Sequence, residues 1–226
     1  MTEQTIATVL ASENPAKIKF DVLVIESEKS LFPFQFNNTR TVYPEGKFGF
    51  NKYLNIGLKS TNNKFVCLCN NDLIFYQNWA SEILAAMEGD NTILSATPYC
   101  RNYHQSIGYT AYTTPAEGYF GVFTGWCFFV KRTIFDTIGK LDEKLLFWYC
   151  DNDYLQLLLQ YKIKNVLVPT SFIRHLGSES LKGADQKLYD KLTLLPQLYY
   201  NYKWHHRSIL RYKAEKLIFT LKQAFQ

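Results

Sequence analysis

Short apolar runs alternate along the chain with stretches in which apolar residues recur every three or four positions. The first pattern predicts strands and the second predicts amphipathic helices. The predicted strands cover residues 20–25, 65–69, 92–97, 124–130 and 165–168. The predicted helices cover residues 2–11, 51–59, 79–88, 133–138 and 152–161, together with most of the chain after residue 182. Strands that alternate with helices favour an α/β fold with a mostly parallel sheet.

The run Phe65–Cys69 is continuously apolar and predicts a strand buried on both faces of a parallel sheet. It ends in three polar residues, Asn70, Asn71 and Asp72. Ligands of open α/β sheets bind beyond the carboxyl ends of such strands, and a carboxylate there suits Mg²⁺ or Mn²⁺ together with phosphate oxygens. The same residues also fit a polar turn in which Asp72 or Asn78 caps the next helix. Both interpretations stay open at this point.

Composition indicates an ordinary globular chain. Its 226 residues are 47% hydrophobic and 20% charged, which predicts one domain or one domain with a small appendage. The aromatic share of 16% suits sugar-binding surfaces and core packing alike. The net charge of +5 is uneven, because the segment from Lys182 onward has nine Lys and Arg against three Asp and Glu, or +6, and the rest has −1. The excess of basic residues is confined to the C-terminal segment, and the sequence has no known nucleic-acid-binding motif, so it argues against nucleic-acid binding.

Cysteine usage and the N-terminal sequence bear on location. The five cysteines show no zinc-binding spacing and predict free thiols in a reducing compartment. The first residues do not form a signal peptide, and no stretch approaches the ~20 apolar residues of a membrane span. We therefore expect a cytoplasmic protein. Residues 1–25 are also too few for a strand–helix–strand unit of about 30 residues, so we expect no strand before the first helix.

Four segments, in this order, resemble the inverting family 2 glycosyltransferases of GT-A fold. They are the strand end Val-Ile-Glu-Ser at 24–27, the helix at 50–57, Cys-Asn-Asn-Asp-Leu at 69–73, and the long stretch 124–153. The last contains Thr-Gly-Trp-Cys, Lys-Arg, Gly-Lys-Leu-Asp-Glu and Tyr-Cys-Asp-Asn-Asp, similar to the family pattern Gly…Lys/Arg-Arg…Gly-x-Phe-Asp-Glu…Glu-Asp-x-Asp. Ile-Arg-His at 173–175 follows where the family often has a metal-binding histidine. The order and spacing of these segments carry the resemblance.

The resemblance implies a GT-A-type sheet that lacks the family's first strand. It implies a metal-dependent, inverting hexosyl transfer from a UDP-, GDP- or dTDP-linked sugar to a hydroxyl of a glycan or lipid-linked glycan. Asp72 and His175 would be the protein ligands of Mn²⁺ or Mg²⁺, although His175 alone also fits a structural histidine. The implied donor contacts are Glu26, Asn55, Asn70 and Asn71.

Asp151 is the implied catalytic base, which would take the proton of the acceptor hydroxyl. The same residue also fits a helix N-cap, in which case Asn152 or Asp153 is the alternative cap. Cys150 departs from the glutamate that the family usually has before this aspartate. Trp126, Trp148 and Tyr149 flank this aspartate and fit either a platform on which acceptor sugars stack or core packing, and Gly125 belongs to the same predicted acceptor site.

Two flanking motifs have plainer interpretations. The sequence favours a turn at Asp142–Glu143, and it favours a solvated pair at Lys131–Arg132 over a contact with phosphate.

Two other function classes compete with this interpretation. A nucleotidyltransferase would share the sheet and the metal, but it would need an early Gly-rich basic loop, which the sequence lacks. A carbohydrate- or membrane-surface-binding module on a decayed GT-A domain is the non-enzymatic alternative. We expect a catalytic domain at 1–181 and a basic helical extension at 182–226. Its last helix is amphipathic and basic, so it fits either an anionic membrane surface or packing on the domain or a second subunit.

Overall fold

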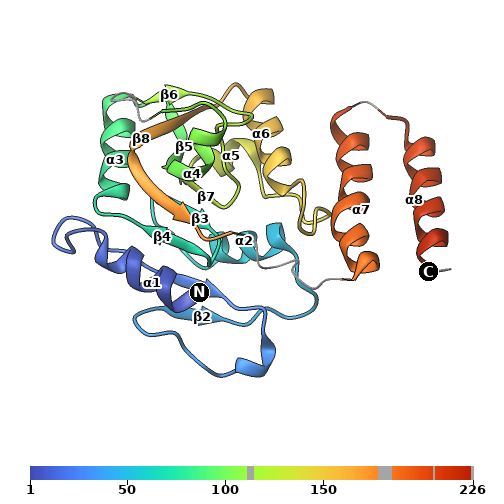
Figure 1. The fold of residues 1–226 in the computed structure, drawn as a ribbon, viewed down its shortest axis with the longest axis horizontal. Coiled ribbons are helices and arrows are strands. Elements are labelled where there is room, and N and C mark those ends of the chain that lie inside the picture. The colour runs from blue at the N-terminus through green and yellow to red at the C-terminus, as the bar shows by residue number, and fades with distance from the viewer. Residues whose placement is uncertain (111–114, 178–184, 206, 225–226) are drawn as a thin grey trace.

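The computed structural model describes residues 1–110, 115–177, 185–205 and 207–224. It confirms the α/β class, with a mixed central sheet flanked by helices (Figure 1). The strand order of this sheet is β3-β7-β5-β8-β4, and β6 pairs with β8 off that path. The strands are β3 (Phe65–Cys69), β4 (Leu73–Phe75), β5 (Ile93–Cys100), β6 (Ala116–Glu117), β7 (Cys127–Lys131) and β8 (Lys164–His175).

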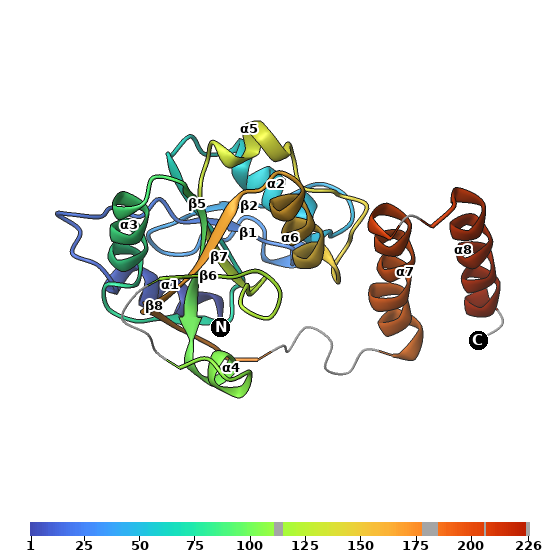
Figure 2. The same ribbon diagram turned by 90° about the horizontal axis from the view of Figure 1, so that it is seen from above.

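Helices cover both faces of the sheet (Figure 2). They are α1 (Thr2–Ala11), α2 (Phe50–Lys59), α3 (Trp79–Gly89), α4 (Arg101–Ser106), α5 (Ile134–Ile138), α6 (Cys150–Gln160), α7 (Gln186–Trp204) and α8 (Ile209–Ala224), with a 3-10 turn at Lys29–Leu31. A separate parallel pair is formed by β1 (Leu23–Ile25) and β2 (Arg40–Val42). The five cysteines have free thiols, as predicted.

The prediction for β3 was wrong about its neighbours. The strand has the expected bounds, but it lies at one end of the sheet and pairs antiparallel with β7. β7 is buried on both faces, with Cys127 and Phe129 facing one core and Phe128 and Val130 facing the other. An apolar run reports burial, and it does not report which strands lie beside it or in which direction they run. Between β5 and β8, by contrast, the pairing is parallel.

The two cores fix the helices against the sheet. On one face α3 buries Trp79, Ile83 and Met87 against the sheet. On the other face α5 and α6 bury Ile134 and Leu158, among others. Burial of each such side chain contributes about 1.5–3 kcal/mol, so both helix layers are held mainly by apolar packing.

Helix α1 covers the edge of β4 that faces away from β8. Thr5 Oγ1 lies 2.8 Å from the carbonyl oxygen of Asn71 and 2.9 Å from that of Leu73, and it accepts the Leu73 N–H at 3.1 Å. Thr8 Oγ1 accepts the Phe75 N–H at 3.2 Å. Threonine hydroxyls therefore occupy the peptide groups that a further strand would use. The strand predicted at 20–25 is shorter in the structure, where β1 begins at Leu23, and α1 is the only helix or strand among the described residues that precede it.

The two residues that follow α1, Ser12 and Glu13, cap the first turn of α3. The Glu13 carboxylate accepts the N–H groups of Ala80 and Ser81, and Ser12 Oγ accepts the indole N–H of Trp79. Asn78 occupies the N-cap position of α3 with a φ of 64°, and its side chain makes no capping bond. A distant glutamate therefore caps this helix, where the sequence suggested Asp72 or Asn78.

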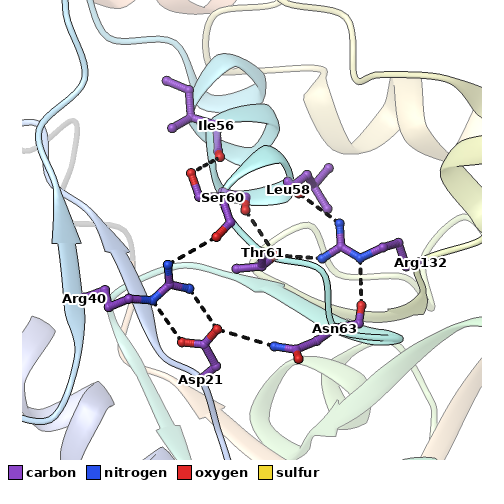
Figure 3. A network of polar contacts seen from close by, with 9 residues as sticks. Asp21, Arg40, Ile56, Leu58, Ser60, Thr61, Asn63 and Arg132 are labelled. Carbon is purple, nitrogen blue, oxygen red and sulfur yellow. Dashed lines mark hydrogen bonds and ion pairs between the residues drawn. The ribbon is translucent and has the colours of Figure 1, made fainter.

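The basic pair Lys131 and Arg132 is structural, which corrects the prediction of a solvated pair. The guanidinium of Arg132 donates to the carbonyls of Leu58 and Asn63 and to Thr61 Oγ1, which ties the end of α2 to the sheet (Figure 3). Lys131 Nζ donates in the same way to carbonyls at the end of α3. Both cations are thereby engaged at helix C-termini, where positive charge is favourable.

The C-terminal helices form a hairpin beside the sheet domain. Helix α7 lies between α6 and α8 in both views (Figures 1 and 2). Tyr200 of α7 is buried, and its hydroxyl accepts from Gln156 of α6 at 3.1 Å. Among the described helices, none combines the length and the apolar character that crossing a bilayer requires.

Candidate functional site

The ends of β4 and β8 bring two predicted metal ligands together. The strands pair antiparallel with Leu73 opposite His175, and the Leu176 N–H donates to the Asp72 carbonyl at 2.9 Å. As a result His175 Nε2 lies 3.1 Å from Asp72 Oδ2. Asp72 is buried and His175 is half-buried. Residues 103 positions apart in the sequence are thus adjacent at one edge of the sheet.

Trp126 and Asn70 lie in the same place. The Asn70 N–H donates to the Trp126 carbonyl at 2.8 Å, which extends the β3–β7 pairing by one bond. The Trp126 indole stacks flat on the His175 imidazole, with ring centroids 4.5 Å apart and planes 3° apart. Stacking of this kind holds the imidazole in one orientation. The Asn70 side chain is half-buried beside this group, and no hydrogen bond joins it to a described residue.

The polar atoms of this pair are incompletely satisfied. Within the described part of the chain, Asp72 Oδ1 is a buried atom without a hydrogen-bond partner, and His175 Nε2 has only the 3.1 Å contact with Asp72 Oδ2, which lacks hydrogen-bond geometry. Buried polar atoms are almost always satisfied, so such exceptions call for a ligand or a charge. A carboxylate suits Mn²⁺ and Mg²⁺ when phosphate oxygens complete the shell, and an imidazole beside it favours a transition-metal ion such as Mn²⁺ over Mg²⁺. No group of three or more protein ligands is present among the described residues, so a cation here would need oxygens from another molecule.

Asp151 lies against Gly125, the residue before Trp126. It belongs to the first turn of α6, and Oδ1 accepts the Asn152 N–H at 2.9 Å. A Cβ built on Gly125 would lie 2.5 Å from Asp151 Cβ, so only glycine allows this approach. Solvent reaches the carboxyl, yet desolvation by the surrounding protein raises its pKa above the ordinary value, against a smaller lowering by the N–H groups of Asn152 and Asp151 itself.

The helix-cap alternative for Asp151 is therefore only partly realised. Tyr149 occupies the N-cap position of α6 with a φ of 68°, and it makes no side-chain capping bond. Asp151 accepts the N–H of its immediate neighbour, which leaves Oδ2 facing Gly125. The carboxylate is thus held in place without being fully engaged.

Asp153, two residues along the same helix, is closed off. It is 1% exposed, and Oδ1 accepts from Lys203 Nζ at 2.7 Å and from the Trp204 indole at 2.7 Å. Lys203 also contacts Asp142 Oδ2 at 2.9 Å, and Tyr199 donates to the same oxygen at 2.8 Å. Helix α7 thereby fixes the first turn of α6, which holds Asp151.

No protein-family model and no curated protein matches the sequence. Solved structures do match. One is GalNAc-T7 with UDP, GalNAc and Mn²⁺, at 15% identity and a TM-score of 0.62 over 87% of this chain and 46% of that one. Another is mannosyltransferase PcManGT from Pyrobaculum calidifontis with GDP-Man and Mn²⁺, at 11% identity and a TM-score of 0.63 over 92% of this chain and 61% of that one.

A third match is S. aureus TarS, at 13% identity and a TM-score of 0.56 over 77% of this chain and 57% of that one. The chain has the GT-A fold. It spans about half to three fifths of the length of these relatives in structure. At such identities the likeness shows the fold alone, and membership of family 2 remains a prediction.

Within this GT-A fold, the predicted donor contacts separate into two groups. Asn70 and Asn71 lie beside Asp72, although the Asn71 side chain donates to Thr2 of α1 at 2.9 Å. Asn55 is buried, and its amide is bonded to the backbone of Leu141 and to Glu143. We therefore leave Asn55 out of the proposed donor site.

Glu26 lies at the end of β1 in the separate two-stranded sheet, where it accepts the Glu28 N–H at 2.7 Å. It therefore stands at a strand end, as predicted from the sequence.

The predicted acceptor residues differ in how free they are. Trp148 is 46% exposed and lies three residues before Asp151. The Tyr149 ring packs on Tyr200 of α7, at 5.0 Å between centroids. Gly125 and Trp126 serve the carboxylate and the histidine, as described above.

Tyr103 of α4 also lies at this site, and the sequence did not predict it. Its ring meets the Trp126 indole edge-on at 5.0 Å, and its pKa is raised by desolvation and then by the charge of Asp151. The only available signal was the tyrosine-rich composition of residues 101–117.

Proposed function

We propose that this chain is a divalent-cation-dependent, inverting glycosyltransferase that moves a hexose from a nucleotide-sugar donor to a hydroxyl of a glycan or lipid-linked glycan. The observation that carries the proposal is the pair Asp72 and His175, in which Oδ2 and Nε2 lie 3.1 Å apart without hydrogen-bond geometry and Asp72 Oδ1 has no hydrogen-bond partner among the described residues. It stands at a strand-end edge of a GT-A sheet. The neighbours crystallised with UDP or GDP-Man and Mn²⁺ support it.

The cation site fits this chemistry. Asp72 and His175 would hold Mn²⁺ or Mg²⁺, and Asn70 and Asn71 lie close enough along the chain to contact the donor. A cation at this place offsets the negative charge that develops on a departing diphosphate. The protein supplies the orientation, because Trp126 fixes the imidazole and β4 fixes the carboxylate.

Asp151 supplies the base in this proposal. Its carboxylate takes the proton of the acceptor hydroxyl while that oxygen bonds to the anomeric carbon and the bond to the diphosphate oxygen breaks. The products are the glycoside, the nucleoside diphosphate and the protonated carboxyl. Attack from the face opposite the leaving group inverts the anomeric centre. A raised pKa strengthens Asp151 as a base, and the exposed Trp148 offers a ring face for the acceptor sugar.

The test is a thermal-shift screen of UDP-, GDP- and dTDP-linked hexoses with and without Mn²⁺, followed by donor hydrolysis. We expect one donor class to raise the melting temperature in a Mn²⁺-dependent manner. Asp72→Asn and His175→Ala should abolish the Mn²⁺-dependent part of this shift. The matched controls are Asp136→Asn and His205→Ala, which change the same residue types at exposed positions away from the site.

Three outcomes would contradict the proposal. The first is a donor shift that does not depend on the cation. The second is an equal loss in the control variants. The third is tight donor binding without any hydrolysis or transfer, which would favour the binding-module alternative.

A further inference from the structure

Helix α8 is the outermost element of the C-terminal hairpin and presents two different faces. Its inner face packs on α7, where Tyr212 stacks on Tyr202 with ring centroids 5.1 Å apart. Glu215 lies on this inner face and pairs with Arg207 at 3.3 Å. The half-buried positions of α8 recur three or four residues apart, and they are Tyr212, Glu215, Phe219 and Gln223. One stripe of the helix is therefore already used by the fold.

The opposite stripe is apolar and exposed. Leu210, Leu217, Ile218 and Leu221 are 76%, 60%, 53% and 50% exposed. Their spacing of seven, one and three residues places them on one side of a helix over a length of about 16 Å. Four large aliphatic side chains in one contiguous stripe exceed the scattered apolar residues of an ordinary protein surface.

Basic residues lie on both sides of this stripe. Helical geometry places Arg211 and Lys222 along one flank and Lys213 and Lys216 along the other. The single acidic residue of α8, Glu215, is on the inner face and is shared by Arg207 and Arg211. The outward face thus combines aliphatic side chains with positive charge and no negative charge among its described residues.

We propose that the outer face of α8, meaning Leu210, Leu217, Ile218 and Leu221 with Arg211, Lys213, Lys216 and Lys222, docks on an anionic lipid bilayer. The aliphatic stripe enters the boundary between headgroups and acyl chains, and the Lys side chains reach the lipid phosphates, while Arg211 stays paired with Glu215. Charge complementarity selects this occupant, because the segment from Lys182 onward has a net charge of +6.

A second copy of the chain fits this face less well. Two α8 helices that share their apolar stripes would bring basic flanks against basic flanks, with no acidic side chain on either outer face among the described residues. The stripe also has no group that makes a directional hydrogen bond, which a specific protein groove would recognise. A bilayer supplies the apolar layer and the negative charge together.

The experiment is co-sedimentation of the full chain with vesicles. Phosphatidylcholine vesicles with about one third phosphatidylglycerol are compared with pure phosphatidylcholine vesicles, without any donor. We expect binding to the anionic vesicles that weakens at about 0.5 M salt, since screening shortens the reach of the basic flanks. Leu217→Glu/Leu221→Glu should lower the partition coefficient at least about tenfold.

Matched variants keep the test specific. Leu159→Glu/Tyr161→Glu makes the same kind of change at exposed positions around the end of α6, and it should leave vesicle binding unchanged. Lys213→Glu/Lys216→Glu should lower binding at least about fivefold and flatten its salt dependence, whereas Lys17→Glu/Lys19→Glu should not. Melting temperatures confirm that each variant is folded, and the charge pair still tests the proposal should the apolar pair unfold.

The proposal is overturned if the full chain stays in the supernatant with anionic vesicles, or if the control pairs lose binding as much as the α8 pairs. It is also overturned if analytical ultracentrifugation shows a dimer that Leu217→Glu/Leu221→Glu dissociates while no lipid binding is seen. Because no donor is present, these outcomes are independent of the proposed sugar transfer.

Discussion

Two groups of carboxylates differ in what balances their negative charge. Asp72 and Asp151 belong to the candidate site, and Asp142 and Asp153 lie at the junction of α6 with α7. At the junction, Lys203 Nζ lies 2.9 Å from Asp142 and 2.7 Å from Asp153. At the candidate site no Lys or Arg among the described residues pairs with Asp72 or Asp151. A lysine is a permanent cation at neutral pH and holds the junction closed. The candidate site has only the imidazole of His175, so its carboxylates keep the capacity to bind a cation or a proton.

The first turn of α6 shows this difference over two residues. Asp153 is buried and receives two donors from α7, whereas Asp151 is reached by solvent and receives only backbone N–H groups of its own turn. The comparison assigns a structural role to Asp153 and leaves Asp151 free for chemistry. Each prediction below changes one side of this comparison.

The largest expected effect is on Asp151. Asp151→Asn should lower turnover about 10²–10⁴-fold, because the amide cannot accept a proton at neutral pH. The melting temperature should stay equal or rise slightly, since a carboxyl with a raised pKa destabilises the fold while it is ionised. Initial rates with saturating donor measure the first effect. A rate close to that of the original chain would show that Asp151 is not the base.

Gly125→Ala should have the next largest effect on rate. Its Cβ would lie 2.5 Å from Asp151 Cβ and 3.0 Å from Asp151 Oδ2, so the carboxylate must move. A displacement of about 1 Å costs about 10²-fold in rate. Cation-dependent donor binding should change little, and a KM-against-kcat comparison separates the two. Gly89→Ala is the matched control, because a Cβ there meets no atom within 4 Å.

The junction should respond in stability. Lys203→Met leaves Asp153 buried without its cation and should cost about 2–3 kcal/mol of unfolding free energy, below the 3–5 of a fully buried pair because Lys203 is partly exposed. Urea denaturation measures this loss. In the double variant Lys203→Met/Asp153→Asn much of the lost unfolding free energy should be recovered, because no unpaired charge is left buried. If Lys203→Met unfolds at the same urea concentration as the original chain, the junction does not hold α7 in place.

The smallest effect concerns pH. Desolvation raises the pKa of Asp151, so the base becomes protonated at a higher pH than an ordinary aspartate, whose value is 3.8. The rate at saturating donor should therefore fall on acidification in a limb that lies above pH 3.8. A pH–rate profile checks this, and Asp151→Asn should lose that limb. An unaltered limb in the variant would assign it to another group.

The sequence predicted local structure better than it predicted neighbours. Helices α1, α2 and α3 were expected within about two residues of their observed bounds, because their apolar spacing is regular. The strand Phe65–Cys69 had the right bounds and the wrong position in the sheet. Arg132 looked like a solvent-exposed cation, and it is bonded to three groups that precede it by about 70 residues. Pattern along the chain carries no information about such contacts.

The candidate site followed a similar division. Asp72 and His175 were predicted from the resemblance to family 2, and in the structure Asp72 Oδ2 lies 3.1 Å from His175 Nε2. Asn55 belonged to the same resemblance and is engaged inside the fold. Lys203 and Tyr103 were missed, because a single lysine or tyrosine far from any motif has no periodicity that marks it. Their roles exist only once α7 and α4 are packed against the sheet.

The threonine face of α1 has a consequence for the behaviour of the protein in solution. β4 is an edge strand, and a bare edge offers unpaired N–H and C=O groups as a template on which another chain can add a strand. Thr5 and Thr8 occupy those groups through hydroxyls, which a neighbouring polypeptide cannot extend into a ladder. Helix α1 therefore protects the edge strand β4 from pairing with a strand of another chain, which would otherwise favour aggregation.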